Sequence, residues 1–183
     1  MLDTMNIICY YTGNAKYYFV KRGGHMPISL DHIDKKILLL LEQDSSISNL
    51  ELSKAVGLSP SACLARTKNL VEKGVIRRFT TLLDEKKLGF EITAFITINL
   101  APYNRETIDN FVERVKELPY ILECYTLTGS KDYLLKAVAP SIEVYKENVI
   151  NALVSIPGIS SMETSIVVST EKRELMVPIS NNT

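Results

Sequence analysis

The sequence is poor in the residues that disulfide-rich, metal-binding and fibrous proteins require. Its 183 residues include 3 cysteines, 2 histidines, 8 glycines, 7 prolines and no tryptophan. Cys9, Cys63 and Cys124 lie far apart and form no C-x-x-C pair, which is typical of reduced thiols in a cytoplasmic protein. Glycine and proline are scarce and 46% of the residues are hydrophobic, which excludes collagen-like and disordered classes.

Long hydrophobic runs are also missing. The longest, residues 37–41 and 95–100, fall well short of the roughly 20 residues that cross a bilayer, so we expect no membrane partner. The N-terminus carries no signal-peptide pattern. Residues 1–27 have no lasting hydrophobic period apart from a strand pattern at Ile7–Tyr11. We expect a poorly ordered extension there, with Met26 as a candidate native start.

The zero net charge conceals an asymmetry between the two halves. Residues 1–90 hold 13 basic and 9 acidic residues, whereas residues 91–183 hold 8 and 12. Basic residues gather between positions 59 and 89: Arg66, Lys68, Lys73, Arg77, Arg78, Lys86 and Lys87. A basic surface joined to an acidic half indicates a polyanion-binding module fused to a second function, and chance clustering on solvated faces is the alternative.

Three helices are predicted in the first half. Apolar residues at Ile33, Ile37, Leu40 and Leu41 recur at helical spacing and predict a helix over Ser29–Asp44. A second helix is expected from Ser48 or Asn49 to Gly57. Ser59 is suited to cap a third helix that starts with Pro60 and reaches Lys73. Its expected buried side is Cys63, Leu64, Thr67, Leu70 and Val71.

Helix, glycine turn and capped helix form a helix-turn-helix pattern. Val75–Leu83 predicts a following strand and Asp84–Lys87 a turn, as in a winged variant. We therefore expect a winged helix-turn-helix domain over residues 28–90, with its junction at Gly89–Glu91.

The second half changes from helical to strand periodicity. Ile92, Ala94, Ile96 and Ile98 alternate with polar or exposed positions, which predicts a strand. The later elements are expected at Ile108–Leu118 (helix), Ile121–Thr128 and Tyr133–Ala139 (strands), Ser141–Ile156 (helix) and Met162–Ser169 (strand). This β-α-β-β-α-β order predicts a ferredoxin-like domain over 91–175, followed by a tail at 176–183, and the whole chain is of α+β class.

Two modules in this order resemble the leucine-responsive/asparagine regulator (Lrp/AsnC) family. The run Ile47–Ser61, followed by Arg66, Leu70 and Gly74–Ile76, is similar to its DNA-binding half, and Thr128–Leu135 is similar to its effector-sensing half. The resemblance spans about residues 29–175. It implies sequence-specific binding to double-stranded promoter DNA and homodimers that assemble further, often into octamers. It also implies an amino-acid effector such as leucine, with no other cofactor.

A recognition helix presents its N-terminal residues to the major groove while basic side chains contact phosphates. The DNA-binding candidates are Asn49, Ser59, Ser61, Ala62, Arg66, Lys68, Arg77 and Arg78. Two of them have a structural alternative, because Arg66 is able to brace the domain through an ion pair and Asn49 to cap the second helix. A specific operator needs two such domains, so we expect a dimer. An open sheet has helices on one face only, and pairing of two sheets would cover the face that carries either Phe95 and Thr97 or the alternate residues.

The turn Thr128–Asp132 offers backbone N–H groups, hydroxyls and a carboxylate, which together are able to hold an amino acid. The resemblance places effectors at this loop, between dimers. The effector candidates are Thr128, Gly129, Ser130, Asp132, Tyr133, Ser165, Ile166 and Val167. The alternative is a plain hairpin turn in which Gly129 needs a positive φ and Asp132 bonds the backbone. Ser130 and Lys131 depart from the acidic residues common in this loop, so the ligand's identity stays open.

Three alternatives to an effector-responsive regulator are an effector-independent DNA-binding architectural or autoregulatory protein of the same fold, an enzyme, and a protein-binding module. An enzyme on a ferredoxin-like domain finds no support, since no paired carboxylates, no nucleophile with a base and no phosphate-binding glycine loop are evident. The salt dependence of binding distinguishes a helix-turn-helix that binds protein from one that binds DNA, because affinity for DNA falls steeply as ionic strength rises.

Overall fold

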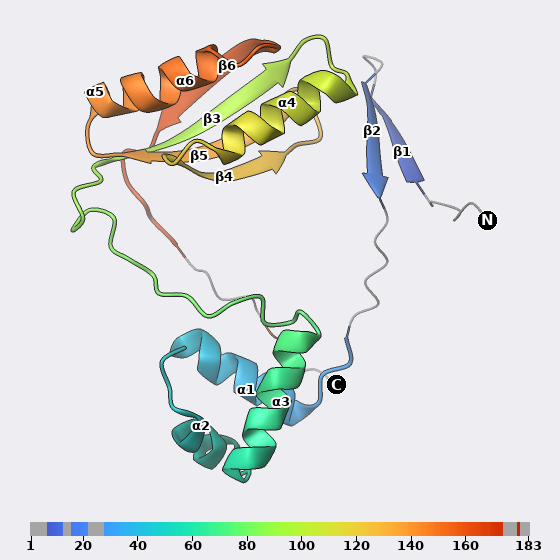
Figure 1. The fold of residues 1–183 in the computed structure, drawn as a ribbon, viewed down its shortest axis with the longest axis vertical. Helices are drawn as coiled ribbons and strands as arrows, with labels where there is room; N and C mark the ends of the chain where they lie inside the picture. The colour runs from blue at the N-terminus through green and yellow to red at the C-terminus, as the bar shows by residue number, and fades with distance from the viewer. Residues whose placement is uncertain (1–6, 13–15, 22–27, 174–178, 180–183) are drawn as a thin grey trace. The chain divides into compact units, whose positions relative to one another are not determined.

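The computed structural model describes residues 7–12, 16–21, 28–173 and 179, and Figure 1 shows its ribbon. The chain divides into two compact units, one containing Leu83–Glu171 and the other containing Gly23–Leu82 together with Lys172–Thr183. The boundary at Leu82 therefore precedes the expected junction at Gly89–Glu91. The predicted strand at Ile7–Tyr11 is confirmed as β1 (Ile7–Thr12), and it pairs antiparallel with β2 (Lys16–Lys21), which the sequence reading missed.

The three predicted helices are confirmed, and each begins at a side-chain cap. Helix α1 (His32–Gln43) starts at Asp31, α2 (Asn49–Val56) at Ser48 and α3 (Pro60–Glu72) at Ser59. Each cap accepts a hydrogen bond from the third backbone N–H that follows it, which satisfies one of the unpaired donors of the first turn. Gly57 ends α2 with φ 76°, a conformation that glycine adopts without steric cost.

The helices enclose a small hydrophobic core, which we call the helical core: Ile37, Leu38, Leu52, Val56, Cys63 and Leu70. The prediction that Leu64 and Val71 are buried is wrong, since they are 43% and 42% exposed. At 100° per residue both lie about a quarter turn around α3 from Cys63, and the short helices α1 and α2 do not extend that far. The buried side of α3 is therefore narrower than the distribution of apolar residues along this helix predicts.

The strand predicted at Val75–Leu83 is absent. Residues 77–84 adopt no regular secondary structure, and the expected turn follows at 85–89. Phe79, Leu82 and Leu83 are exposed, and no strand among the described residues pairs with this segment. A β-strand needs an adjacent strand to pair with its backbone N–H and C=O groups. The local sequence pattern does not show whether such a strand is present.

The second unit follows the predicted β-α-β-β-α-β order. It consists of β3 (Ile92–Leu100), α4 (Arg105–Lys116), β4 (Ile121–Thr126), β5 (Tyr133–Ala139), α5 (Ile142–Tyr145), a π-helical turn (Lys146–Ile150), α6 (Asn151–Val154) and β6 (Ile159–Ile166). The sheet is antiparallel with strand order β4-β5-β3-β6. Strand β6 lies three residues earlier than predicted, because it pairs with the end of β3 directly after Gly158.

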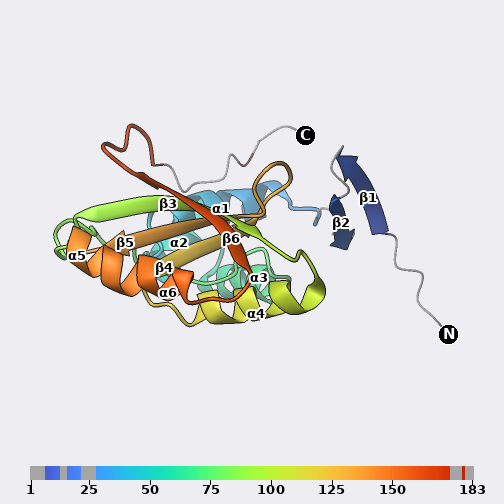
Figure 2. The same ribbon diagram turned by 90° about the horizontal axis from the view of Figure 1, so that it is seen from above.

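Helices α4 to α6 cover one face of this sheet, as Figure 2 shows. Alternate residues of β3, from Ala94 to Leu100, point into that layer and pack with Phe111 of α4 and Leu153 of α6. The remaining residues of β3, including Phe95 and Thr97, lie on the opposite face. We call this opposite face the open face.

Candidate DNA and effector sites

The start of α3 is exposed and rich in hydrogen-bonding groups. Ser59, Ser61 and Ala62 are all exposed. The Ser59 hydroxyl accepts the Ala62 N–H at 3.3 Å and lies 3.2 Å from the Ser61 hydroxyl. These groups, with the positive end of the helix dipole, suit a phosphate or the edge of a base. The three predicted residues therefore lie together on one accessible helix end.

Asn49 ties α2 to the start of α3. Its Nδ2 donates to the Pro60 carbonyl at 2.9 Å. The alternative that Asn49 caps α2 is wrong, because Ser48 is the cap. A contact of Asn49 with DNA stays a prediction, and the observed role is to hold the two helices of the motif in register.

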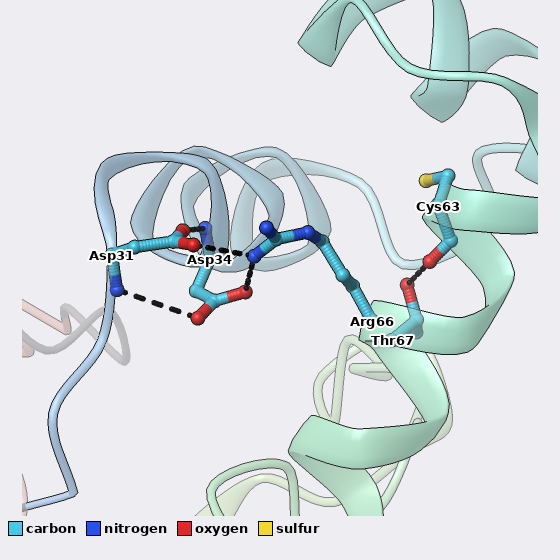
Figure 3. Close-up of polar contacts among 5 residues, drawn as sticks. All are labelled: Asp31, Asp34, Cys63, Arg66 and Thr67. Carbon is cyan, nitrogen blue, oxygen red and sulfur yellow. Dashed lines mark hydrogen bonds and ion pairs between the residues drawn. The ribbon is translucent and has the colours of Figure 1, made fainter.

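Arg66 joins α3 to the start of α1, as Figure 3 shows. Its Nη1 lies 2.6 Å from Asp31 Oδ2 and 2.8 Å from Asp34 Oδ1. The predicted ion pair is thus confirmed, while contact of Arg66 with DNA stays a prediction. The Asp34 backbone N–H, and after it the Arg66 guanidinium, hold the pKa of Asp31 below its usual value. The two carboxylates in turn raise the pKa of Arg66.

Three basic candidates keep their charge available to a ligand. Lys68, Arg77 and Arg78 are exposed, and none forms an ion pair with a described residue. Lys68 lies one turn beyond Leu64 on the outer side of α3, and the two arginines follow the helix closely in the chain. A polyanion is the class of partner that unpaired, exposed cations of this kind attract.

The loop Thr128–Asp132 combines an exposed outer part with a buried inner residue. Thr128, Gly129 and Ser130 are exposed, and Gly129 has φ 125°. Asp132 is fully buried, and its Oδ2 accepts the Leu100 N–H at 2.9 Å. The hairpin alternative is confirmed for the conformation of Gly129 and for the backbone bond of Asp132. Contact of Asp132 with a ligand ammonium stays a prediction.

The two groups of predicted effector residues are not brought together within one chain. Ser165 and Ile166 of β6 pair with Phe95 and Ala94 of β3, and the Val167 N–H donates to Thr93 at 2.8 Å. The loop instead contacts the other end of β3, where the Asp132 N–H donates to the Asn99 side chain. Four residues separate Asn99 from Phe95, which corresponds to about 14 Å along a strand.

Tyr133 lies in the core and not in the loop. It is 2% exposed and packs against Phe111 with ring centroids 4.6 Å apart. Burial raises the pKa of its hydroxyl, and a hydrogen bond with Thr126 opposes that rise. Tyr133 also lines a cavity of about 410 Å³ between α4 and β4, together with Val112, Val115, Ile121 and Leu122. Sequence reasoning missed this cavity, because it forms where the edge strand β4 is only partly covered by α4.

The open face of the sheet carries apolar, polar and charged groups. Phe95 is 38% exposed, and Lys136 pairs with Glu123 at 3.2 Å. The Thr97 hydroxyl is buried and has no hydrogen-bond partner among the described residues. Buried hydroxyls normally find a partner in the protein or in ordered water.

The described residues show neither a metal-binding cluster nor a membrane span. No group of three histidine, cysteine, aspartate or glutamate side chains within them is able to hold a metal ion. None of the helices in the described part of the chain is long and apolar enough to cross a bilayer.

Two family models match the chain in the order of its two units. A winged helix-turn-helix DNA-binding model matches residues 30–77, and the Lrp/AsnC ligand-binding domain matches residues 93–177. The first match lies within residues 28–90, and the second begins at residue 93 and ends at residue 177.

Individual relatives agree with these models. The chain is 60% identical over 154 residues to the transcriptional regulator AzlB of Bacillus subtilis, covering 84% of this chain and 98% of that protein. It is 37% identical over 153 residues to the leucine-responsive regulatory protein of Escherichia coli K12, with 84% and 92% covered. A transcriptional regulator of Neisseria meningitidis, solved in complex with L-methionine, shares its fold with a TM-score of 0.77 at 33% identity, covering 82% and 97%.

The hydrogen bond from the Asp34 backbone N–H, together with the ion pair of Arg66, predicts an acid-sensitive contribution of Asp31 to stability. Because the pKa of Asp31 is lower in the folded chain than its ordinary value of 3.8, this contribution is present above about pH 4 and is lost as the pH falls through the folded pKa. Asp31→Asn keeps a capping oxygen and removes the charge. We expect it to lower the Tm by about 1–5 °C at pH 6 and by a smaller amount at pH 3.

Thermal unfolding followed by circular dichroism at both pH values measures this difference. Glu72→Gln, which removes an exposed charge near the end of α3, is the control and should change the Tm at neither pH. An equal loss for Asp31→Asn at pH 6 and pH 3 would show that the charge of Asp31 does not stabilise the fold.

Proposed function

The chain belongs to the Lrp/AsnC family of transcriptional regulators, and from this premise we propose that it binds promoter DNA as a homodimer or larger assembly whose DNA affinity an amino acid changes. The observation that carries the proposal is the exposed, uncovered start of α3 within the segment that matches the helix-turn-helix model. The relatives that match over most of the chain are likewise transcriptional regulators by name.

In the proposed complex the start of α3 enters the major groove. Ser59, Ser61 and the backbone N–H groups beside them contact base edges or the nearest phosphate. Lys68, Arg77 and Arg78 neutralise phosphates along the flanking backbone. Arg66 and Asn49 act as positioning residues, because their side chains hold α3 against α1 and α2.

Each cation that contacts a phosphate should make the affinity for DNA depend more steeply on salt concentration. For the variants Lys68→Ala, Arg77→Ala and Arg78→Ala, we expect the slope of log K against log salt to become shallower by about 0.9 per lost contact. Fluorescence anisotropy with a duplex from the chain's own upstream region, titrated between low and moderate salt, measures the slope.

Lys116→Ala, which removes an exposed cation from the end of α4, is the control and should leave the slope unchanged. If all three variants bind with the slope of the unaltered chain, the proposed placement of the DNA along α3 is wrong.

The proposed dimer forms through the open face. A sheet with one uncovered face exposes Phe95 to water and leaves the Thr97 hydroxyl without a partner. Packing of a second sheet would bury the ring and offer the hydroxyl a hydrogen bond. Two helix-turn-helix domains would then be joined in one particle, as two half-sites require.

Phe95→Asp places a charge on this face and should convert the oligomer into a subunit of 20.6 kDa, because an unpaired charge at the centre of an interface is strongly unfavourable. Light scattering coupled to size-exclusion chromatography gives the mass. Val154→Asp changes a residue of α6 that is 67% exposed on the opposite side and should leave the mass unaltered. A Phe95→Asp chain that keeps its full assembly would rule out the open face as the contact.

The proposed effector site is the loop Thr128–Asp132. Its exposed residues offer hydroxyls and backbone amides to an amino acid, while Asp132 fixes the base of the loop to β3. Ser165 lies about 14 Å from this loop along β3, and Ile166 and Val167 lie farther along it, so they join the same site only from another subunit. An effector bound between subunits is able to favour one assembly over another, which couples it to DNA affinity.

A thermal-shift screen of the twenty amino acids tests the loop as the effector site, beginning with leucine. We expect at least one amino acid to raise the Tm of the unaltered chain, and Thr128→Val with Ser130→Ala to weaken its apparent affinity about tenfold or more through lost hydrogen bonds to charged groups. Val112→Phe fills the cavity beside Tyr133 and serves as the comparison. A response abolished by Val112→Phe and kept by the loop variant would move the effector from the loop to the cavity.

A further inference from the structure

The C-terminal tail contributes to the helical core. Ile179 is half-buried and packs against the cluster formed by Ile37, Leu38, Leu52, Val56, Cys63 and Leu70. It follows β6 by thirteen residues, yet residues 172–183 belong to the same compact unit as α1, α2 and α3. The match to the ligand-binding model ends at residue 177, two positions before Ile179.

We propose that Ile179 is a structural part of the DNA-binding unit, which it stabilises by packing on the helical core. The helical core contains only six buried apolar side chains, drawn from three helices of 8 to 13 residues. Domains of this size bury a small fraction of their surface and are marginally stable alone. Ile179 is one of nine partly buried apolar residues that pack against this cluster, so it adds to the burial that holds α1, α2 and α3 together.

The tail also makes a second covalent connection between the two units. The first connection is the linker after α3, and the second runs from the end of β6 to Ile179. The second connection starts at Ile166 and Val167, whose backbone pairs with β3.

Two described residues shortly after β6 lack such packing. Val168 is 98% exposed, and Ser169 bonds only to the nearby Glu171 among the contacts of its side chain. The connection is thus anchored at β6 and at Ile179, with an exposed stretch after β6. Among the described residues that follow β6, Ile179 is the one that packs on the helical core, so its substitution tests the contact.

Amide hydrogen exchange of the full chain, without DNA or amino acids, tests the proposal. For Ile179→Asp we expect exchange in α1, α2 and α3 to become about five- to tenfold faster, because local opening becomes easier when an apolar contact is lost. Exchange in β3 and β5 should not change. A chain that ends at Arg173 should behave like Ile179→Asp, and Ile179→Val should retain most of the protection.

Val168→Asp is the matched control, since it places the same charge on an exposed position of the same connection. It should leave exchange in α1, α2 and α3 unchanged. Unaltered protection of the three helices in Ile179→Asp would overturn the proposal, as would a loss of protection confined to the sheet. Because no DNA or effector is present, either result is independent of the operator and effector experiments.

Discussion

The orientation of α3 is the constraint on which the DNA-binding surface depends. Burial of Cys63 and Leu70 determines which side of the helix faces the core, and the opposite side faces outward with Lys68. Apolar burial is the larger energetic term, at about 1.5–3 kcal/mol for a large aliphatic side chain. Two polar contacts then fix the helix more finely: Asn49 holds its first turn, and Arg66 ties it to the start of α1. The exposed ion pair of Arg66 orients α3 more than it stabilises the fold, because water screens the charges.

A second constraint shapes the effector loop. A buried carboxylate is costly unless hydrogen bonds compensate it, and Asp132 meets this requirement through the Leu100 N–H. The same residue donates its own N–H to the Ile98 carbonyl, so the base of the loop is fixed to the end of β3. Thr128, Gly129 and Ser130 are left on the surface, where a small molecule is able to reach them. Asp132 thus supports the loop from within.

Sequence patterns predicted the elements that depend on local interactions. Ser48 and Ser59 were recognisable as candidate helix starts because capping involves only the next three residues, and Gly57 was recognisable because a left-handed residue ends a helix. The order of strands and helices in the second unit also followed from periodicity. The strand expected at Val75–Leu83 failed for the opposite reason, because high β-propensity does not form a strand without a neighbour.

By itself, the sequence determined the three capped helices, the alternation along β3 and the pairing of a helix-turn-helix with a β-α-β-β-α-β unit, because each depends on spacing within a short stretch. Only the tertiary structure decided the partners of Arg66, the burial of Asp132, the exposure of Leu64 and the contact of Ile179 with the helical core. These outcomes depend on which distant residues meet across the fold. A side chain's neighbours in space, unlike its neighbours in the chain, are set by packing.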